Sequence, residues 1–167
     1  YKQANYIMKE TKLTNADGTV KKEVVQAYIG NKTEAGTPPL KYLYDNFAHD
    51  SGLELQNIKT EIDEVIVYGK IPSHSICIPT VASSNYSPDF MYVVKRADGT
   101  KELNIVIETK AYDKESYIAT DEETKISCAD EFIKAMTANG YTVHFKKQIN
   151  SNSVKNIINE LVTTSDK

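Results

Sequence analysis

The segment that most constrains the fold runs from Ser87 to Lys110 and has the pattern of a β-hairpin. Residues 90–94 are rich in aromatic and β-branched side chains, residues 97–100 carry an Asp-Gly turn signal, and residues 103–107 have the composition of a second strand. A hairpin of this kind needs further elements to cover its apolar residues. The sequence therefore predicts that these two strands lie inside a larger sheet.

Charged residues stand at one end of this hairpin. Strand pairing can place Asp89 beside Glu108, and Lys110 shares a strand face with Glu108 because side chains alternate. Adjacent carboxylates favour a hard cation such as Mg²⁺, and a nearby lysine suits the metal-assisted hydrolysis of a phosphodiester. Taken alone, the same pattern also describes a surface hairpin with a cross-strand pair between a lysine and a carboxylate.

The length and the cysteine content set broader limits. A chain of 167 residues suggests one domain, large enough to fold without a disulfide or a metal. There are two cysteines, Cys77 and Cys128, and they lie far apart in the sequence. The default expectation is a cytosolic protein with reduced thiols. We expect no transmembrane helix and no signal peptide, and the missing initiator Met suggests a piece of a larger protein.

The charge argues against strong autonomous binding to DNA. The net charge is −3, and Arg96 is the only arginine. Nucleic-acid affinity depends on a basic face that displaces counterions from the phosphates. If the chain cuts DNA, we expect other domains or subunits to hold the substrate.

The order of the elements predicts an α/β fold. We expect a mixed β-sheet flanked by helices in a core at 49–167, with an N-terminal hairpin and linker extension at 1–48 that packs on this core. The extension would contain a hairpin over 4–13 and 20–29. The predicted core elements are a helix over 52–63, a strand over 64–68 broken at 69–72, the hairpin, a helix over 120–139, a strand over 141–145 and a helix capped by Ser153.

Several motifs in this core resemble a known family. Tyr86-Ser87-Pro88-Asp89-Phe90 together with Ile107-Glu108-Thr109-Lys110 resembles the PD-(D/E)XK nuclease superfamily. The flanking stretches at 50–54, 67–72, 78–80 and 123–129 resemble the C-terminal nuclease domain of type III restriction enzyme Res subunits. The likeness runs from about His49 to Phe145.

The resemblance implies a restriction-endonuclease-like core at 49–167. It also implies a metal-dependent endonuclease that cleaves double-stranded DNA in the bacterial cytoplasm. Its cofactor would be Mg²⁺, with Mn²⁺ as a substitute, and its partners would be a methyltransferase (Mod) subunit and the helicase portion of a parent Res chain. The sequence has no Gly-x-x-x-x-Gly-Lys-Ser/Thr loop, so ATP would be used only by that motor portion. The alternatives are a non-catalytic docking or DNA-clamping module of the same parent, and a free-standing nuclease that shares only the superfamily fold.

The resemblance also assigns roles to three residues. Asp89 and Glu108 would bind the metal, and Lys110 would contact the attacking water or stabilise the phosphorane. The alternative for Asp89 is a turn or strand-start aspartate after Pro88. For Glu108 it is a solvent-facing glutamate, and for Lys110 a salt bridge to either carboxylate.

Three further residues have weaker assignments. Glu54 would join the metal site from the first core helix, although Ser51-x-x-Glu54 is also a capping box that explains Glu54 without a metal. Lys125 and Tyr112 would contact DNA. A solvated Lys125 paired with Asp121 or Glu122 is an equally good interpretation.

Overall fold

A mixed four-stranded sheet forms the centre of the protein. The computed structural model describes residues 15–17, 21, 29–80, 85–96, 102–110, 112–113, 120–138 and 143–163. The strand order is β3-β6-β7-β8, with antiparallel pairing up to β7 and parallel pairing between β7 and β8. The strands are β3 (Val65–Lys70), β6 (Phe90–Lys95), β7 (Glu102–Lys110) and β8 (Val143–Ile149). The predicted mixed sheet and its central hairpin are confirmed.

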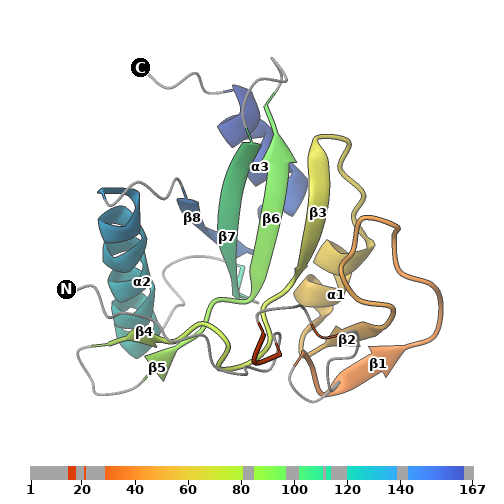
Figure 1. Ribbon diagram of the computed structural model, residues 1–167, viewed down its shortest axis with the longest axis horizontal. Coiled ribbons are helices and arrows are strands. Elements are labelled where there is room, and N and C mark those ends of the chain that lie inside the picture. Colours follow the sequence, from red (N-terminus) through yellow and green to blue (C-terminus); the bar gives the residue numbers. More distant parts are fainter. Residues whose placement is uncertain are drawn as a thin grey trace.

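Helices cover both faces of this sheet (Figure 1). The helices are α1 (Gly52–Lys59), α2 (Thr120–Ala138) and α3 (Val154–Thr163). On one face, α1 and α3 contribute Ile58, Ile157 and Ile158 to the main core, where they pack with the sheet residues Phe90, Tyr92, Val94, Ile105 and Ile107. On the other face, α2 contributes to a smaller core with Ala129 and Phe132. The result is a three-layer α/β/α arrangement.

Two short hairpins flank the sheet. β1 (Lys32–Glu34) pairs with β2 (Phe47–His49), which packs near α1, and β4 (Ile78–Pro79) pairs with β5 (Asn85–Tyr86) beside α2. Figure 1 shows β4 and β5 at the end of α2, below the lower ends of β6 and β7. The β4–β5 hairpin therefore lies on the same side of the sheet as the smaller core.

Local sequence explains where α1 begins and where it ends. The Ser51 Oγ accepts a hydrogen bond from the Glu54 amide at 3.2 Å, as the predicted capping box requires. The helix ends at Lys59, four residues before the predicted end, because Thr60 is extended. Ile62 remains in the core at 3% exposure although it lies beyond the helix. The spacing of the apolar residues up to Ile62 therefore indicated that Ile62 is buried, but not that it is helical.

The predicted break at 69–72 is wrong for its first two residues. Gly69 and Lys70 continue β3 and pair with Met91 and Phe90. A Cβ on Gly69 would lie 3.0 Å from the Leu43 side chain, so the glycine here allows close packing rather than a turn.

The later helices and the last strand form where they were predicted. The α2 and α3 helices are confirmed, and the Ser153 Oγ accepts from the Asn156 amide at the start of α3. The last strand is confirmed with shifted bounds. Apart from Lys21 and Ile29, the N-terminal hairpin predicted over 4–13 and 20–29 lies outside the described residues.

A buried pair of amide side chains joins α1 to β8. Asn57 Nδ2 donates to Gln148 Oε1 at 2.6 Å, and Gln148 Nε2 donates back to Asn57 Oδ1 at 3.1 Å. Both side chains are 1% exposed. We expect Asn57→Leu to destabilise the fold by about 2–3 kcal/mol because Gln148 is left buried with unmet hydrogen bonds. Adding Gln148→Met is expected to recover part of that loss, which urea unfolding measures. A double variant that is less stable than Asn57→Leu would contradict this account.

Candidate active site

The β6–β7 hairpin brings Asp89 next to the end of β7. Phe90 pairs with Ile107, and the same register continued by one residue sets Asp89 opposite Glu108. Asp89 Oδ2 accepts hydrogen bonds from the Thr109 amide at 2.8 Å and from the Thr109 hydroxyl at 2.6 Å. The Asp89 carbonyl accepts from the Ile71 amide at 2.8 Å. Asp89 is therefore fixed at the start of β6 by both neighbouring strands.

Glu108 is a buried carboxylate whose two oxygens both have partners. It is 2% exposed. Oε1 lies 2.8 Å from the Lys110 ammonium, and Oε2 accepts from the Tyr86 hydroxyl. Val106, Glu108 and Lys110 follow one another on one face of β7, as predicted, and this is the face toward α2 and β5. The ion pair between Lys110 and Glu108, given above only as the non-catalytic alternative, is present.

Burial and nearby negative charges change the protonation of both carboxylates. Burial, and then the negative charge of Asp89, raise the pKa of Glu108 to about 7, although Lys110 and Tyr86 act in the opposite direction. Burial also raises the pKa of Asp89, against the hydrogen bonds from Thr109. A position with this surplus of negative charge favours the arrival of a cation.

Lys110 belongs to a chain of alternating charges that reaches α2. Its ammonium also pairs with Glu122, whose other oxygen lies 2.9 Å from Lys125. Burial opposes the charge of Lys110, but Glu108 and Glu122 outweigh it and raise its pKa above the ordinary value. The hydrogen bonds from Lys110 and Lys125 lower the pKa of Glu122. Lys110 is therefore positively charged across the whole range in which proteins work.

A second ion-pair cluster lies beside Asp89. Lys70, at the end of β3, is 4% exposed, and its ammonium lies 2.6 Å from Glu54 Oε2 and 3.1 Å from Asp50 Oδ2. The same Glu54 oxygen accepts from the Asp50 amide at 2.6 Å. Glu54 is near enough to Asp89 for its charge to raise the pKa of Asp89. Glu54 thus accepts from the amide that precedes the Ser51 cap, pairs with Lys70 and lies near Asp89.

The predicted site residues therefore fall into two groups. Asp89, Glu108 and Lys110 lie together, with Glu54 close by. Lys125 contacts the site only through Glu122, and Tyr112 follows β7, with its amide bonded to the Lys110 carbonyl at 2.8 Å. The roles of Glu54 as a metal ligand and of Lys125 and Tyr112 as DNA contacts stay predictions.

Sequence reasoning gave no role to three residues that the structure places here. Tyr86 was quoted only as part of a motif. Glu122 was named in the pattern that opens a helix and as a pairing partner for Lys125, and Lys70 as part of a predicted break and of the flanking stretch 67–72. The signal for Lys70 was its position at the end of an apolar strand. The contacts of Tyr86 and Glu122 are long-range and have no local signature.

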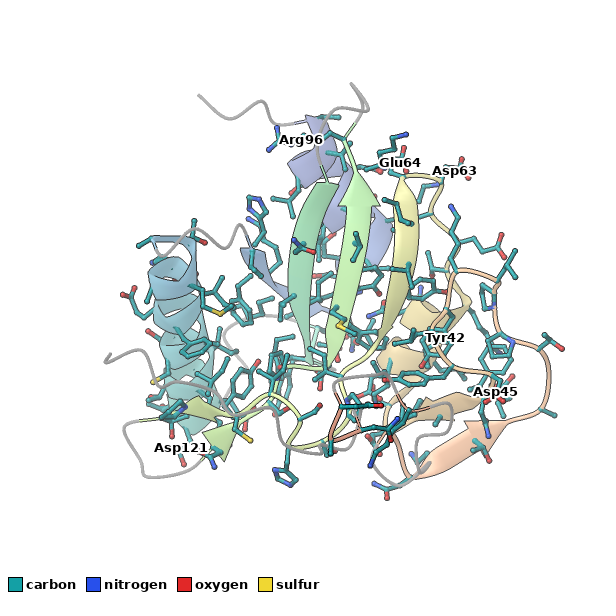
Figure 2. All side chains as sticks on the ribbon, in the orientation of Figure 1. Tyr42, Asp45, Asp63, Glu64, Arg96 and Asp121 are labelled. Atoms are coloured by element: carbon teal, nitrogen blue, oxygen red, sulfur yellow. The ribbon has the colours of Figure 1, made fainter. Side chains whose placement is uncertain are left out.

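The site lies at one end of the sheet, and the only arginine lies at the other. Asp89 precedes the start of β6, whereas Arg96 follows its end. Figure 2 shows Arg96 at the top of the molecule and Asp121, at the start of α2, near the bottom with the site end of the strands. Lysines alone therefore supply the side-chain cations near these carboxylates, within the part of the chain that the structure describes.

Comparison with known proteins decides the family. The family described as "Endonuclease domain" matches residues 40–152. The chain belongs to this endonuclease-domain family. This endonuclease domain is 39% identical over 150 residues to the EcoPI Res subunit of Escherichia phage P1, a type III restriction-modification enzyme. It is 38% identical over 150 residues to the EcoP15I Res subunit of Escherichia coli, also a type III enzyme. Each match covers 89% of the chain but 15% of the relative.

More distant comparisons add little. The StyLTI Res subunit of Salmonella typhimurium is 27% identical over 127 residues, covering 75% of the chain and 12% of that relative. No solved structure matches the chain. None of the described helices is long and apolar enough to cross a membrane.

The donor set of this endonuclease domain fits a magnesium ion that is shared with a substrate. No group of three or more His, Cys, Asp or Glu side chains within the described ranges could hold a metal by itself. Mg²⁺ is usually bound by one or two carboxylates, with waters and substrate phosphates completing its shell. Asp89 and Glu108 supply that pair, and both hydrogen bonds from Thr109 end on Oδ2 of Asp89. Oδ1 of Asp89 is therefore the oxygen of that carboxylate better placed to bind a metal.

The burial of Glu108 predicts a pH dependence of stability in the metal-free domain. Its folded pKa of about 7 lies above the ordinary 4.5, so the folded state binds more protons and loses stability as the pH rises between these values. We expect Glu108→Gln, measured in EDTA, to be more stable than wild type by on the order of 2 kcal/mol at pH 8. The gain should vanish near pH 4.5. Thermal unfolding of both proteins at pH 8 and at pH 4.5 tests this expectation. An equal difference in stability between Glu108→Gln and wild type at the two pH values would contradict it.

Proposed function

We propose that this endonuclease domain hydrolyses phosphodiester bonds of double-stranded DNA in a Mg²⁺-dependent reaction, with a PD-(D/E)XK site. The observation that carries the proposal is the arrangement of Asp89 and Glu108 on neighbouring strands, with Lys110 bonded to Glu108. Membership of the endonuclease-domain family supports the reaction class. Asp89, Glu108 and Lys110 are its proposed catalytic residues.

Each residue has a distinct part in the proposed reaction. Asp89 and Glu108 would hold the metal ion, and Thr109 fixes the Asp89 carboxylate through two hydrogen bonds. When bound, Mg²⁺ supplies a water of lowered pKa and neutralises charge on the phosphate. Lys110 keeps its positive charge beside Glu108, where it would orient the attacking water and stabilise the negative charge that develops on the phosphate oxygens. The product ends would be 5′-phosphate and 3′-hydroxyl.

We further propose that the domain is the cutting module of a type III Res subunit. The relatives named above are Res subunits of restriction-modification enzymes, and the chain matches 15% of their length. A motor portion that uses ATP and a methyltransferase (Mod) subunit would lie elsewhere in the assembly. The net charge of −3 agrees with this division, because a domain without a net basic charge needs other parts to hold the DNA.

Metal removal tests the proposal in the assembled enzyme. We expect EDTA to abolish cleavage of plasmid DNA by the Res–Mod complex, and both Mg²⁺ and Mn²⁺ to restore it. ATP hydrolysis also uses Mg²⁺, so the assay needs a companion measurement of ATPase activity in a complex carrying Glu108→Ala. That variant should hydrolyse ATP at the wild-type rate without cutting. Cleavage at the wild-type rate by the variant would overturn the proposed site and favour the docking module.

A further inference from the structure

The β4–β5 hairpin carries a tyrosine that reaches the proposed metal site from outside the two central strands. Tyr86 pairs with Ile78 in this hairpin and is 6% exposed. Its ring belongs to the smaller core with Ala129 and Phe132 of α2. Its hydroxyl donates to Oε2 of Glu108. The ring is therefore held by packing while the hydroxyl is bonded to a carboxylate in the site.

This hydrogen bond determines how Glu108 is held. Lys110 binds Oε1 at 2.8 Å and the Tyr86 hydroxyl donates to Oε2, so both oxygens of the carboxylate have a partner. The carboxylate cannot rotate about its terminal bond without losing one of these contacts. Two other tyrosines in the core behave differently. The Tyr92 hydroxyl is buried and has no hydrogen-bond partner among the described residues, whereas the Tyr68 hydroxyl donates to the Ile58 carbonyl at 2.6 Å. Among these three buried rings, Tyr86 is the one whose hydroxyl reaches a carboxylate.

We propose that Tyr86 is a positioning residue that orients Glu108 for metal binding through its hydroxyl. The inference rests on the proposed function, since it presumes that Glu108 is a metal ligand. Groups that hydrogen-bond to metal ligands fix the orientation of those ligands, and their loss typically weakens metal binding about 10- to 100-fold. Tyr86 would act through Glu108 and would not itself touch the metal or the DNA.

The position of Tyr86 gives the β4–β5 hairpin a role. The hairpin adds no strand to the main sheet, yet it packs against α2 and delivers one hydroxyl to the end of β7. Glu122 of α2 reaches Lys110 at the same end. The layer on this face of the sheet therefore contacts both charged residues at the end of β7, Glu108 through Tyr86 and Lys110 through Glu122.

Mn²⁺ titration by calorimetry, on the whole 167-residue chain and at pH 8, tests the inference. We expect Tyr86→Phe, which keeps the ring, to weaken Mn²⁺ binding about 10-fold or more relative to wild type. The matched controls are Tyr92→Phe, which removes a hydroxyl without a partner, and Tyr68→Phe, which removes a structural hydrogen bond. Both controls should keep the wild-type Mn²⁺ affinity, and Tyr68→Phe should lower the thermal stability measured in EDTA.

The outcomes separate this inference from the proposed function. Wild-type affinity in Tyr86→Phe, together with loss of binding in Glu108→Ala, would overturn the role of Tyr86 and leave the proposed function standing. Binding in wild type that is insensitive to Glu108→Ala would overturn both. An equal loss of affinity in Tyr86→Phe and Tyr68→Phe would show that the effect follows from general loosening of the fold, and would also overturn the role.

Discussion

Replacing Asp89 by asparagine is expected to reduce DNA cleavage by the assembled enzyme on the order of 10³-fold, which corresponds to about 4 kcal/mol of transition-state stabilisation. Asparagine keeps the shape of the side chain and an oxygen that accepts the hydrogen bonds from Thr109, so the start of β6 should stay in place. What it loses is the negative charge that a divalent cation requires. Plasmid cleavage by the Res–Mod complex measures the effect.

The control for this variant is Asp63→Asn, which changes an exposed aspartate at the other end of the sheet. Figure 2 shows Asp63 near the top of the molecule, close to Glu64 and away from the site end of the strands. This variant should cut at the wild-type rate. A similar loss in both variants would indicate that the overall negative charge, rather than a site at Asp89, determines the rate.

Replacing Lys110 by methionine is expected to lower the cleavage rate about 10²- to 10³-fold while Mn²⁺ still binds. Unlike Tyr86→Phe, this change also removes a positive charge that repels the metal ion, which offsets the lost contact with Glu108. Methionine keeps most of the length of the side chain and removes the charge that Glu108 and Glu122 both contact. Metal affinity and cleavage should therefore separate, because the lysine acts on the reacting phosphate and water. Single-turnover cleavage at pH 8 gives the rate, and calorimetry at the same pH gives the affinity.

Lys134→Met provides the comparison for Lys110. Lys134 lies on α2, where it pairs with Asp130 and Glu131 of the same helix, and its side chain is 63% exposed. This variant should keep both metal binding and cleavage. Loss of metal binding in Lys110→Met would mean that Lys110 mainly holds the carboxylates in place, and the proposed role at the phosphate would then be wrong.

The central hairpin and the residues at its end could be predicted from the sequence because both depend on local pattern. Alternation along β7 places Glu108 and Lys110 on one face, and antiparallel pairing places Asp89 opposite Glu108. The caps at Ser51 and Ser153 are equally local signals, and both are formed. The family resemblance added the flanking motifs, and it is confirmed by the match to the endonuclease-domain family.

The parts that could not be predicted depend on contacts between distant segments. Tyr86 meets Glu108 across 22 positions of the chain, and Lys70 meets Glu54 across 16. The apolar spacing beyond Lys59 indicated burial of Ile62 but could not distinguish a helix from an extended segment. A glycine at position 69 resembled a strand break, whereas its small size serves the packing of Leu43.

The two lysines explain how several carboxylates can be buried close together in the metal-free protein. Lys70 compensates Glu54 and Asp50, and Lys110 compensates Glu108 and Glu122. Asp89 lies between these clusters, where hydrogen bonds from Thr109 and then the charge of Lys110 favour its ionised form. Burial raises the pKa of both groups first, followed by the negative charge of Glu54 for Asp89 and that of Asp89 for Glu108. A cation that binds at Asp89 and Glu108 would offset these negative charges.

Mn²⁺ titration by calorimetry, comparing wild type with Asp89→Ala and Glu108→Ala, tests the central claim most directly. Both carboxylates are proposed to hold one metal site, so we predict that wild type binds Mn²⁺ and that either substitution abolishes binding. The Asp63→Asn variant should bind as wild type does. Binding that persists unchanged in Asp89→Ala and Glu108→Ala would contradict the claim, because the metal would then lie elsewhere and the two carboxylates would have a structural role only.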